Sequence, residues 1–202
     1  MVHPESSCRL CESTSKRLLF EKKGYSTVQC TNCAVVYLSV TPDKAFLDNL
    51  YSQSYFKGED DSGYGDYLLE KEQVEKTASK RLNQINSFTK NGKTLLEIGA
   101  AYGFFLNVAK ELYTVTGVEL STHASQYASD SLGLNVINGT IHESNFESSQ
   151  FDLVTMWDVI EHLADPMLVM KEVNRIMSSS GLLTLTTPDA GSVLAKLQGK
   201  SW

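Results

Sequence analysis

The sequence predicts an α/β protein with a doubly wound parallel sheet, preceded by a small module that carries all four cysteines. Between residues 95 and 188, short apolar segments that suit strands alternate with segments that suit helices. Such alternation is typical of a parallel sheet covered by helices on both faces. The chain has 202 residues, of which 42% are hydrophobic, and is therefore long enough for one such domain and a small appendage.

Each element is expected from apolar spacing and from the residues at its ends. A helix is expected over residues 66–88, where apolar residues recur at steps of three and four until Asn91 and Gly92. Its stripe consists of Val74, Ala78, Leu82, Ile85 and Phe88. The other helices are expected at 42–51, 104–112, 122–132 (between Ser121 as cap and Gly133), from Asp165 and Pro166 onward, and at 190–197. The strands are expected at 95–99, 113–120, 135–138, 151–157 and 182–188.

The cysteines fall as two CxxC pairs, Cys8 with Cys11 and Cys30 with Cys33, separated by 18 residues. This spacing is typical of a tetrahedral zinc site in a zinc ribbon. Four thiolates leave no coordination position for water, so the zinc should be structural. Two disulfides or idle thiols are the alternative. Glu12 and Ala34 stand where many such turns carry glycine.

Charge and hydropathy restrict the partners. With 18 Lys and Arg against 24 Asp and Glu, the net charge is −6, which disfavours nucleic acid. No run of about 18 apolar residues exists to span a membrane, and the N-terminus has no secretory pattern, so a cytoplasmic protein is expected. The expected domains are a zinc ribbon at 1–40, a polar linker at 41–65 and an α/β domain at 66–202.

The segment LLEIGAAYGFFL, residues 95–106, places a glycine loop between the first strand and its helix, the usual ligand corner of a doubly wound sheet. The dinucleotide pattern GxGxxG fits poorly, because Ala101 and Phe104 replace its second and third glycines. The phosphate loop GxxxxGK[ST] fails because Gly99 and Gly103 stand too close together. Glu119 ends the second strand, where a carboxylate can accept hydrogen bonds from both hydroxyls of a ribose.

What fits this loop is an acidic residue before two glycines, namely Glu97, Gly99 and Gly103. This resembles the first motif of class I S-adenosylmethionine-dependent methyltransferases, with Ala101 in place of a middle glycine. FDLVTMWDVIEHLADP resembles their fourth-strand motif, and RIMSSSGLLTLTTP their fifth-strand motif, so the resemblance extends over residues 95–191. It implies a Rossmann-like fold, an enzyme, and S-adenosylmethionine as cofactor.

The resemblance also implies cofactor-binding positions. Glu97 would supply negative charge near a cationic ligand, and Gly139, Thr140 and Ile141 would lie near the adenine ring. The full expected set is Glu97, Gly99, Ala100, Ala101, Gly103, Glu119, Leu120, Thr140, Ile141, Trp157 and Asp158. The zinc ribbon followed by this domain further resembles the deoxysugar C-methyltransferase group, which implies a small-molecule acceptor such as a sugar intermediate.

Methyl transfer to oxygen or carbon also requires removal of a proton. His162 is the candidate base, because it follows the fourth strand by about one helical turn and imidazole titrates near neutrality. Capping or packing at the helix start is the alternative. Asp158 could contact ligand or hold its loop. Tyr64, Tyr67, Tyr102 and Trp157 could line the cleft or simply pack.

The chain ends shortly after the fifth strand, whereas the methyltransferase sheet of the resembled class has seven. A C-terminally incomplete domain is expected, or a homo-oligomer in which another chain completes the sheet edge. Two other functions remain open. One is an RNA or protein methyltransferase that grips its substrate with the ribbon, although residues 1–40 carry only five basic against three acidic residues. The other is a non-catalytic interaction module.

Overall fold

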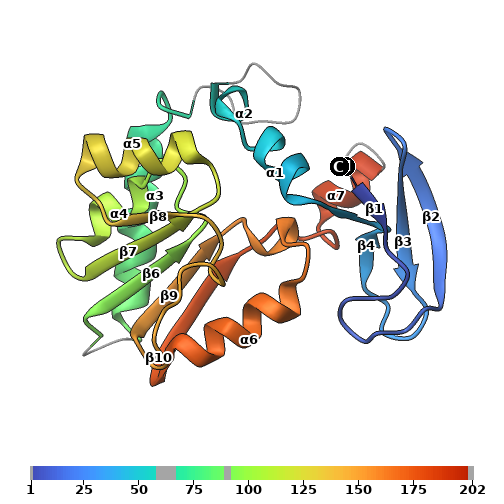
Figure 1. Cartoon of the computed structure of the whole chain (residues 1–202). Helices are drawn as coiled ribbons and strands as arrows, with labels where there is room; N and C mark the ends of the chain where they lie inside the picture. Colours follow the sequence, from blue (N-terminus) through green and yellow to red (C-terminus); the bar gives the residue numbers. More distant parts are fainter. Residues whose placement is uncertain (1, 58–66, 89–91, 200–202) are drawn as a thin grey trace.

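The computed structural model describes residues 2–57, 67–88 and 92–199. Its N-terminal strands form a small module beside a larger α/β part (Figure 1). Among the positions named above, Tyr64, Asn91 and residue 66, the expected start of a helix, lie outside this description. No helix in the described ranges is long and apolar enough to cross a membrane.

The N-terminal module consists of two small antiparallel sheets. Strands β2 (Lys16–Lys22), β3 (Tyr25–Cys30) and β4 (Val36–Leu38) form one, and β1 (Val2–Pro4) pairs with β5 (Val40–Pro42) in the other. Lys23 and Gly24 join β2 to β3 with φ angles of 51° and 80°. Left-handed backbone at both central residues is what a two-residue hairpin turn requires, because it matches the twist of the strands.

The larger part contains a five-stranded parallel sheet in the order β10-β9-β6-β7-β8. The strands are β6 (Thr94–Ile98), β7 (Thr114–Glu119), β8 (Val136–Asn138), β9 (Phe151–Trp157) and β10 (Met177–Thr186). The chain starts in the middle with β6, moves outward to β8, and then returns to the other side of β6 with β9. The strand order therefore reverses at β6, which places the ligand corner of such a fold beyond β6 and β9.

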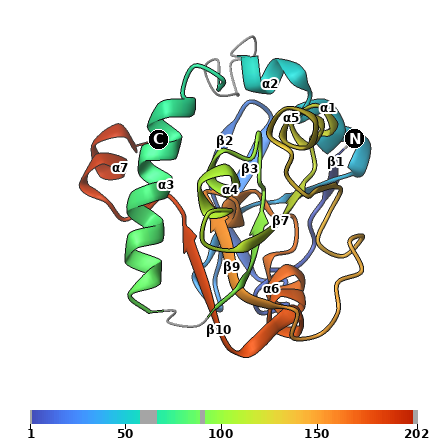
Figure 2. The same cartoon turned by 90° about the vertical axis from the view of Figure 1, so that its left-hand side faces the viewer.

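Helices cover both faces of this sheet (Figures 1 and 2). One face carries α3 (Lys71–Asn86), α4 (Phe104–Ala109) and α5 (Thr122–Leu132), and the other carries α6 (Pro166–Ile176). The short helices are α1 (Lys44–Leu50), α2 (Gln53–Lys57), a 3-10 turn at Ile160–His162, and α7 (Val193–Gln198). The predicted doubly wound α/β fold is confirmed.

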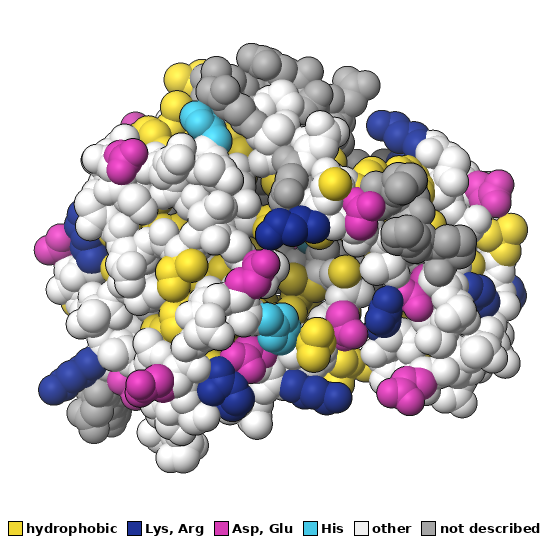
Figure 3. Space-filling model, viewed as in Figure 1, with side chains coloured by type: hydrophobic (Ala, Val, Ile, Leu, Met, Phe, Trp, Pro, Cys, Tyr) yellow, Lys and Arg dark blue, Asp and Glu magenta, His cyan; other side chains and the backbone are white. Residues whose placement is uncertain are grey.

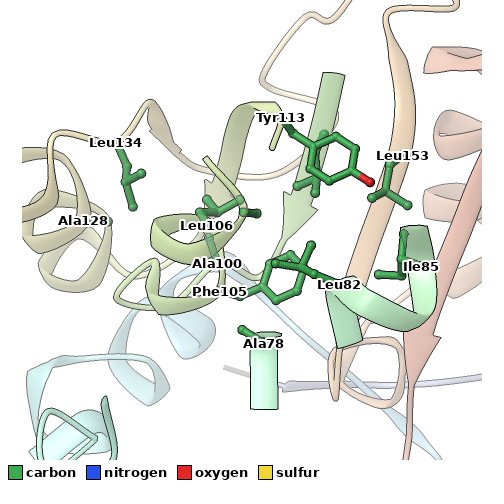
Figure 4. Close-up of a cluster of buried hydrophobic side chains, with 12 residues drawn as sticks. Ala78, Leu82, Ile85, Ala100, Phe105, Leu106, Tyr113, Ala128, Leu134 and Leu153 are labelled. Atoms are coloured by element: carbon green, nitrogen blue, oxygen red, sulfur yellow. The ribbon is translucent and has the colours of Figure 1, made fainter. Parts of the chain in front are cut away.

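Alternation along the strands builds two cores. Leu95 and Leu153 point toward α3 and α4, and their neighbours Leu96 and Val154 point toward α6. Figure 4 shows the first core, in which α3 contributes Ala78, Leu82 and Ile85. All four strand residues are completely shielded from solvent, as expected for a sheet covered on both sides.

Several predicted element ends were wrong. The helix expected at 42–51 begins only at Lys44, because Pro42 belongs to β5 and Asp43 caps α1 through the Phe46 N–H at 2.8 Å. Phe88, expected on the buried stripe, lies beyond the end of α3 and is 78% exposed.

Two later elements also differ from their expected bounds. Helix α4 ends at Ala109 instead of residue 112, because the chain turns there to bury Tyr113 ahead of β7. Strand β10 starts at Met177, five residues earlier than expected, with a register shift before Leu182. The cap Ser121, the helix end at Gly133 and the start of α6 at Asp165 and Pro166 are confirmed.

Candidate cofactor cleft and metal site

The four cysteines converge at one point of the N-terminal module. Their sulfur atoms all lie within 4.8 Å of one another, and the Cys8–Cys33 and Cys11–Cys30 distances are 3.6 Å. A disulfide would need about 2.05 Å. The edge of a tetrahedron with Zn–S bonds of about 2.3 Å is about 3.8 Å long. All four are free thiols, and the cluster could hold a zinc ion.

The CxxC turns build this cluster locally. The N–H of Glu12 donates to the carbonyl of Cys8 at 2.7 Å, and the N–H of Ala34 donates to that of Cys30 at 3.0 Å. Glu12 and Ala34 have φ angles of 61° and 65°, so both turns are left-handed although neither residue is glycine. This conformation disfavours a side chain by roughly 1–2 kcal/mol, which metal coordination would offset.

A cleft of about 410 Å³ opens at the carboxyl ends of the parallel strands. Figure 3 shows charged and histidine side chains around a recess near the centre of one face of the molecule. The predicted residues that line the cleft are Glu97, Gly99, Ala100, Ala101, Glu119, Leu120, Thr140, Ile141, Trp157, Asp158 and His162. Residues at or just after the ends of β6, β7, β8 and β9 therefore meet residues of α2 and α3 and Leu47 of α1 in one space.

Left-handed backbone shapes the loop after β6. Gly99, Ala101 and Gly103 have φ angles of 75°, 47° and 77°. A Cβ on Gly99 would lie 2.5 Å from Val159 Cγ2, so the loop can approach the next strand end only with glycine there. Gly103 does not line the cleft: its Cβ would meet Leu134 Cδ1 at 2.6 Å, so this glycine serves the packing of α4 against α5.

Glu119 ties this loop to the end of β7. Its two carboxylate oxygens accept hydrogen bonds from the N–H groups of Ala101 and Ser121, each at 2.8 Å. Burial raises the pKa of this carboxyl, and the backbone donors partly oppose that rise. Each oxygen keeps a further lone pair, so the group can still accept hydrogen bonds from a ribose.

Glu97 and Arg81 lie at another part of the cleft. Glu97 is 3% exposed, and its Oε2 has no hydrogen-bond partner. The guanidinium of Arg81 lies 4.1 Å from the ring centroid of Trp157 and makes no ion pair within the described residues. Both groups are thus available to a ligand. Burial raises the pKa of Glu97 well above its usual range, helped by Glu119 and opposed by Arg81.

Sequence reasoning missed Arg81, although a signal was present. Arg81 follows Val74 by seven residues and Ala78 by three, and precedes Ile85 by four, so it lies on the apolar stripe of α3. A cation on a stripe that faces the core needs a partner or a function. Tyr51 and Tyr55 from the linker also line the cleft and were missed, because the linker sequence gave no reason to fold it over the sheet.

The residues after β8 form the opposite wall. The N–H of Gly139 donates to the carbonyl of Glu119 at 2.9 Å, and Ile141 is buried. Glu143 accepts hydrogen bonds from the N–H and the hydroxyl of Thr140, each at 2.8 Å. These contacts hold an apolar surface, Ile141, beside polar backbone, which suits a flat heteroaromatic ring.

His162 and Asp158 are exposed at the cleft, and their side chains make no hydrogen bond within the described part of the chain. Asp158 has a φ of 55°, so its backbone is strained where β9 ends. Tyr102 is 1% exposed and packs with Phe56 and Phe104 instead of lining the cleft, whereas Tyr67 lines it.

Residues 71–202, more than half of the chain, match the family model described as "Methyltransferase domain". The chain belongs to this methyltransferase domain family. Ubiquinone biosynthesis O-methyltransferase of Escherichia fergusonii is 26% identical to it over 118 residues, covering 55% of this chain and 46% of the relative. The corresponding Escherichia coli enzyme is 25% identical over 118 residues, again covering 55% of this chain and 46% of the relative. The chain spans about half the length of the curated relatives it matches.

Solved structures share the fold of this methyltransferase domain. A SAM-dependent methyltransferase from Archaeoglobus fulgidus superposes with a TM-score of 0.54 and 20% identity, over 65% of this chain and 62% of that chain. The PH0226 protein of Pyrococcus horikoshii superposes with a TM-score of 0.54 and 22% identity, over 72% of this chain and 71% of that chain. The larger part of the chain therefore has the Rossmann-like α/β fold of a methyltransferase.

Proposed function

We propose that this chain transfers a methyl group from S-adenosylmethionine to a small-molecule acceptor. The observation that carries the proposal is the pair Arg81 and Glu97, a guanidinium and a carboxyl group that face one cleft and form no ion pair within the described residues. A ligand with both a carboxylate and an ammonium would pair with both, and the amino-acid end of this cofactor has them. Glu119 lies beyond Ala101, where a ribose would reach it.

The cofactor supplies an electrophilic methyl group on a positively charged sulfur. Arg81 and Glu97 would hold its amino-acid end, Glu119 its ribose, and Thr140 with Ile141 its adenine. Alignment of the acceptor with the departing sulfur contributes much of the rate in such displacements. We propose His162 as the group that takes up the acceptor's proton, because its imidazole is exposed at the cleft without another partner in the described residues.

The finer proposals concern the acceptor and the organisation of the chain. We infer a sugar intermediate as acceptor, from the resemblance to deoxysugar C-methyltransferases. The Cys8, Cys11, Cys30 and Cys33 cluster would hold a structural zinc ion, since all four positions are thiolates. Residues 1–40, 41–65 and 66–202 would then act as ribbon, linker and methyltransferase domain. The net charge of −6 argues against nucleic acid as substrate.

Calorimetry tests the cofactor. The wild type should bind S-adenosylmethionine and S-adenosylhomocysteine. Arg81→Met keeps an apolar stem over Trp157 but removes the charge, and affinity for both compounds should fall by about tenfold or more, the equivalent of one charge-assisted hydrogen bond. Arg17→Met is the matched control, because Arg17 hydrogen-bonds Gln29 on the N-terminal module at 2.6 Å, and it should bind as the wild type does. A wild type that binds neither compound would refute the proposal.

A further inference from the structure

The hydroxyl group of Tyr37 is a buried polar group beside the cysteine cluster. Tyr37 lies on β4, directly opposite the buried Val28 of β3. Cys30 ends β3 two residues after Val28 and therefore points to the same face of the sheet. An aromatic side chain can reach such a diagonal neighbour across an antiparallel pair. The Tyr37 oxygen is shielded from solvent and has no hydrogen-bond partner within the described residues.

The charged and titratable groups around this hydroxyl are acceptors. Burial raises the pKa of the Tyr37 phenol, and Cys8 and Cys30 raise it further. The phenol therefore keeps its proton near neutral pH and can donate it to a hydrogen bond. Glu5 also faces it, but the Glu5 carboxylate is already paired with the Arg9 guanidinium at 2.7 Å. The two sulfur atoms are better acceptors once a metal binds, because each is then a thiolate.

The cluster already receives hydrogen bonds on its more exposed side. Cys11 is half-buried, and both the N–H of Ser13 and the side chain of Asn32 donate to its sulfur. Four thiolates around one divalent ion carry a net negative charge, and donors next to the ligands stabilise that charge and fix the ligand orientation. Tyr37 is in position to supply the same support to the two buried cysteines of the cluster.

We propose that the Tyr37 hydroxyl donates a hydrogen bond to the thiolate of Cys8 or Cys30 when the cluster holds zinc, and so strengthens zinc binding and restrains the reactivity of the cluster. The inference rests on the proposed zinc site and adds a positioning residue that acts through a ligand instead of touching the metal. A hydrogen bond to a thiolate favours its charged form, and a thiolate stabilised in this way is a weaker nucleophile.

Cobalt(II) in place of zinc reports on the thiolates, through its sulfur-to-metal charge-transfer absorption. Tyr37→Phe removes only the hydroxyl and keeps the ring. Tyr25→Phe is the matched control, because Tyr25 begins β3 at the hairpin end, about 16 Å along the strand from Cys30. Zinc affinity is measured on the full chain by competition with a chromophoric chelator, and zinc release is followed after addition of iodoacetamide.

We expect Tyr37→Phe to bind zinc about tenfold more weakly than the wild type, as is typical when a metal ligand loses its hydrogen-bond partner. Its cobalt charge-transfer band should move to lower energy, because the thiolate loses stabilisation. Iodoacetamide should release zinc from it about threefold faster, since nucleophilicity rises by roughly that factor per unit of thiol pKa. Tyr25→Phe should match the wild type in all three measurements.

Three results would overturn the proposal. One is a Tyr37→Phe variant with the zinc affinity of the wild type. Another is weaker zinc binding with an unshifted cobalt band, which would assign the hydroxyl to packing or to Glu5 instead of to sulfur. The third is a wild type that binds neither metal, which would also refute the zinc site, while calorimetry with S-adenosylmethionine would still decide the proposed methyl transfer separately.

A direct measurement replaces the variant if Tyr37→Phe does not fold. The crystal structure of the zinc-loaded wild type gives the distance from the Tyr37 oxygen to the nearest cysteine sulfur. A distance within about 3.8 Å would support the hydrogen bond, and a longer one would overturn it.

Discussion

Two buried carboxyl groups, Glu97 and Glu119, lie at the ends of neighbouring strands and make the cleft electrostatically costly without a ligand. Glu119 has backbone donors on both oxygens, and Glu97 has a free Oε2. Burial raises the pKa of both groups. A group whose pKa is higher in the folded than in the unfolded protein contributes stability below its unfolded pKa and loses it as the pH rises through its folded pKa.

We therefore predict that the free energy of unfolding of the ligand-free protein includes a component that falls as the pH rises above the usual glutamate range. Glu97→Gln should flatten that fall, by about 1.4 kcal/mol for each unit by which the pKa is raised. Urea denaturation at a series of pH values measures it. Glu111→Gln, at an exposed site, is the control and should follow the wild type. If the unfolding free energy of Glu97→Gln followed pH in parallel with that of the wild type, the pKa of Glu97 would not be raised in the folded protein.

Some of the individual residues that line the cleft were predicted from the sequence. Glu97, Gly99 and Glu119 were found because short motifs fix their positions relative to a strand end. Gly103 belongs to the same motif but packs against α5, and Tyr102 is buried among aromatic rings, because the loop pattern does not say which way a side chain points. Arg81 was missed because its contact with Trp157 joins residues far apart in the sequence.

Among the elements, periodicity predicted all five strands of the parallel sheet, while helix ends were less predictable. The start of α1 was missed because Pro42 pairs with Val2 across the module, a contact that local sequence does not reveal. The start of α6 was predicted correctly, because Asp165 and Pro166 are a strong local signal for a helix N-terminus.

Asp165 has two contacts that two substitutions can separate. Its Oδ1 accepts a hydrogen bond from the Leu168 N–H at 2.9 Å, and its Oδ2 lies 3.7 Å from the Arg9 guanidinium. Asp165→Ala removes both contacts and should lower the free energy of unfolding by about 1 kcal/mol, mostly through the lost cap. Asp165→Asn keeps the capping oxygen and should lose only a few tenths, because the ion pair is partly exposed. Equal losses in urea denaturation would instead assign the effect to the ion pair.

Within the described ranges, two ion pairs connect the N-terminal segment to residues at or beside the cleft. Arg9 reaches Asp165 at 3.7 Å, and Lys44 reaches Glu143 at 3.3 Å. Arg9 is also anchored within its own module, because its guanidinium lies 2.7 Å from the carboxylate of the buried Glu5. Pairs this exposed contribute roughly 0–1 kcal/mol each, so they orient the module more than they stabilise it.

Metal removal should therefore affect the two parts of the molecule differently. A zinc ion at the cysteine cluster would stabilise the small N-terminal sheets, so we expect a chelator or Cys30→Ser to unfold them, with the loss of one zinc ion per chain by metal analysis and a change in circular dichroism. The affinity of the cleft for S-adenosylhomocysteine should weaken by only about threefold, because Arg81, Glu97 and Glu119 belong to the separate core of the larger part and the connecting ion pairs are weak. Zinc returned to the chelated wild type should restore the circular dichroism signal, which controls for damage by the chelator. If ligand binding were lost completely when the metal is removed, the cleft would depend on the folded N-terminal module, contrary to this prediction.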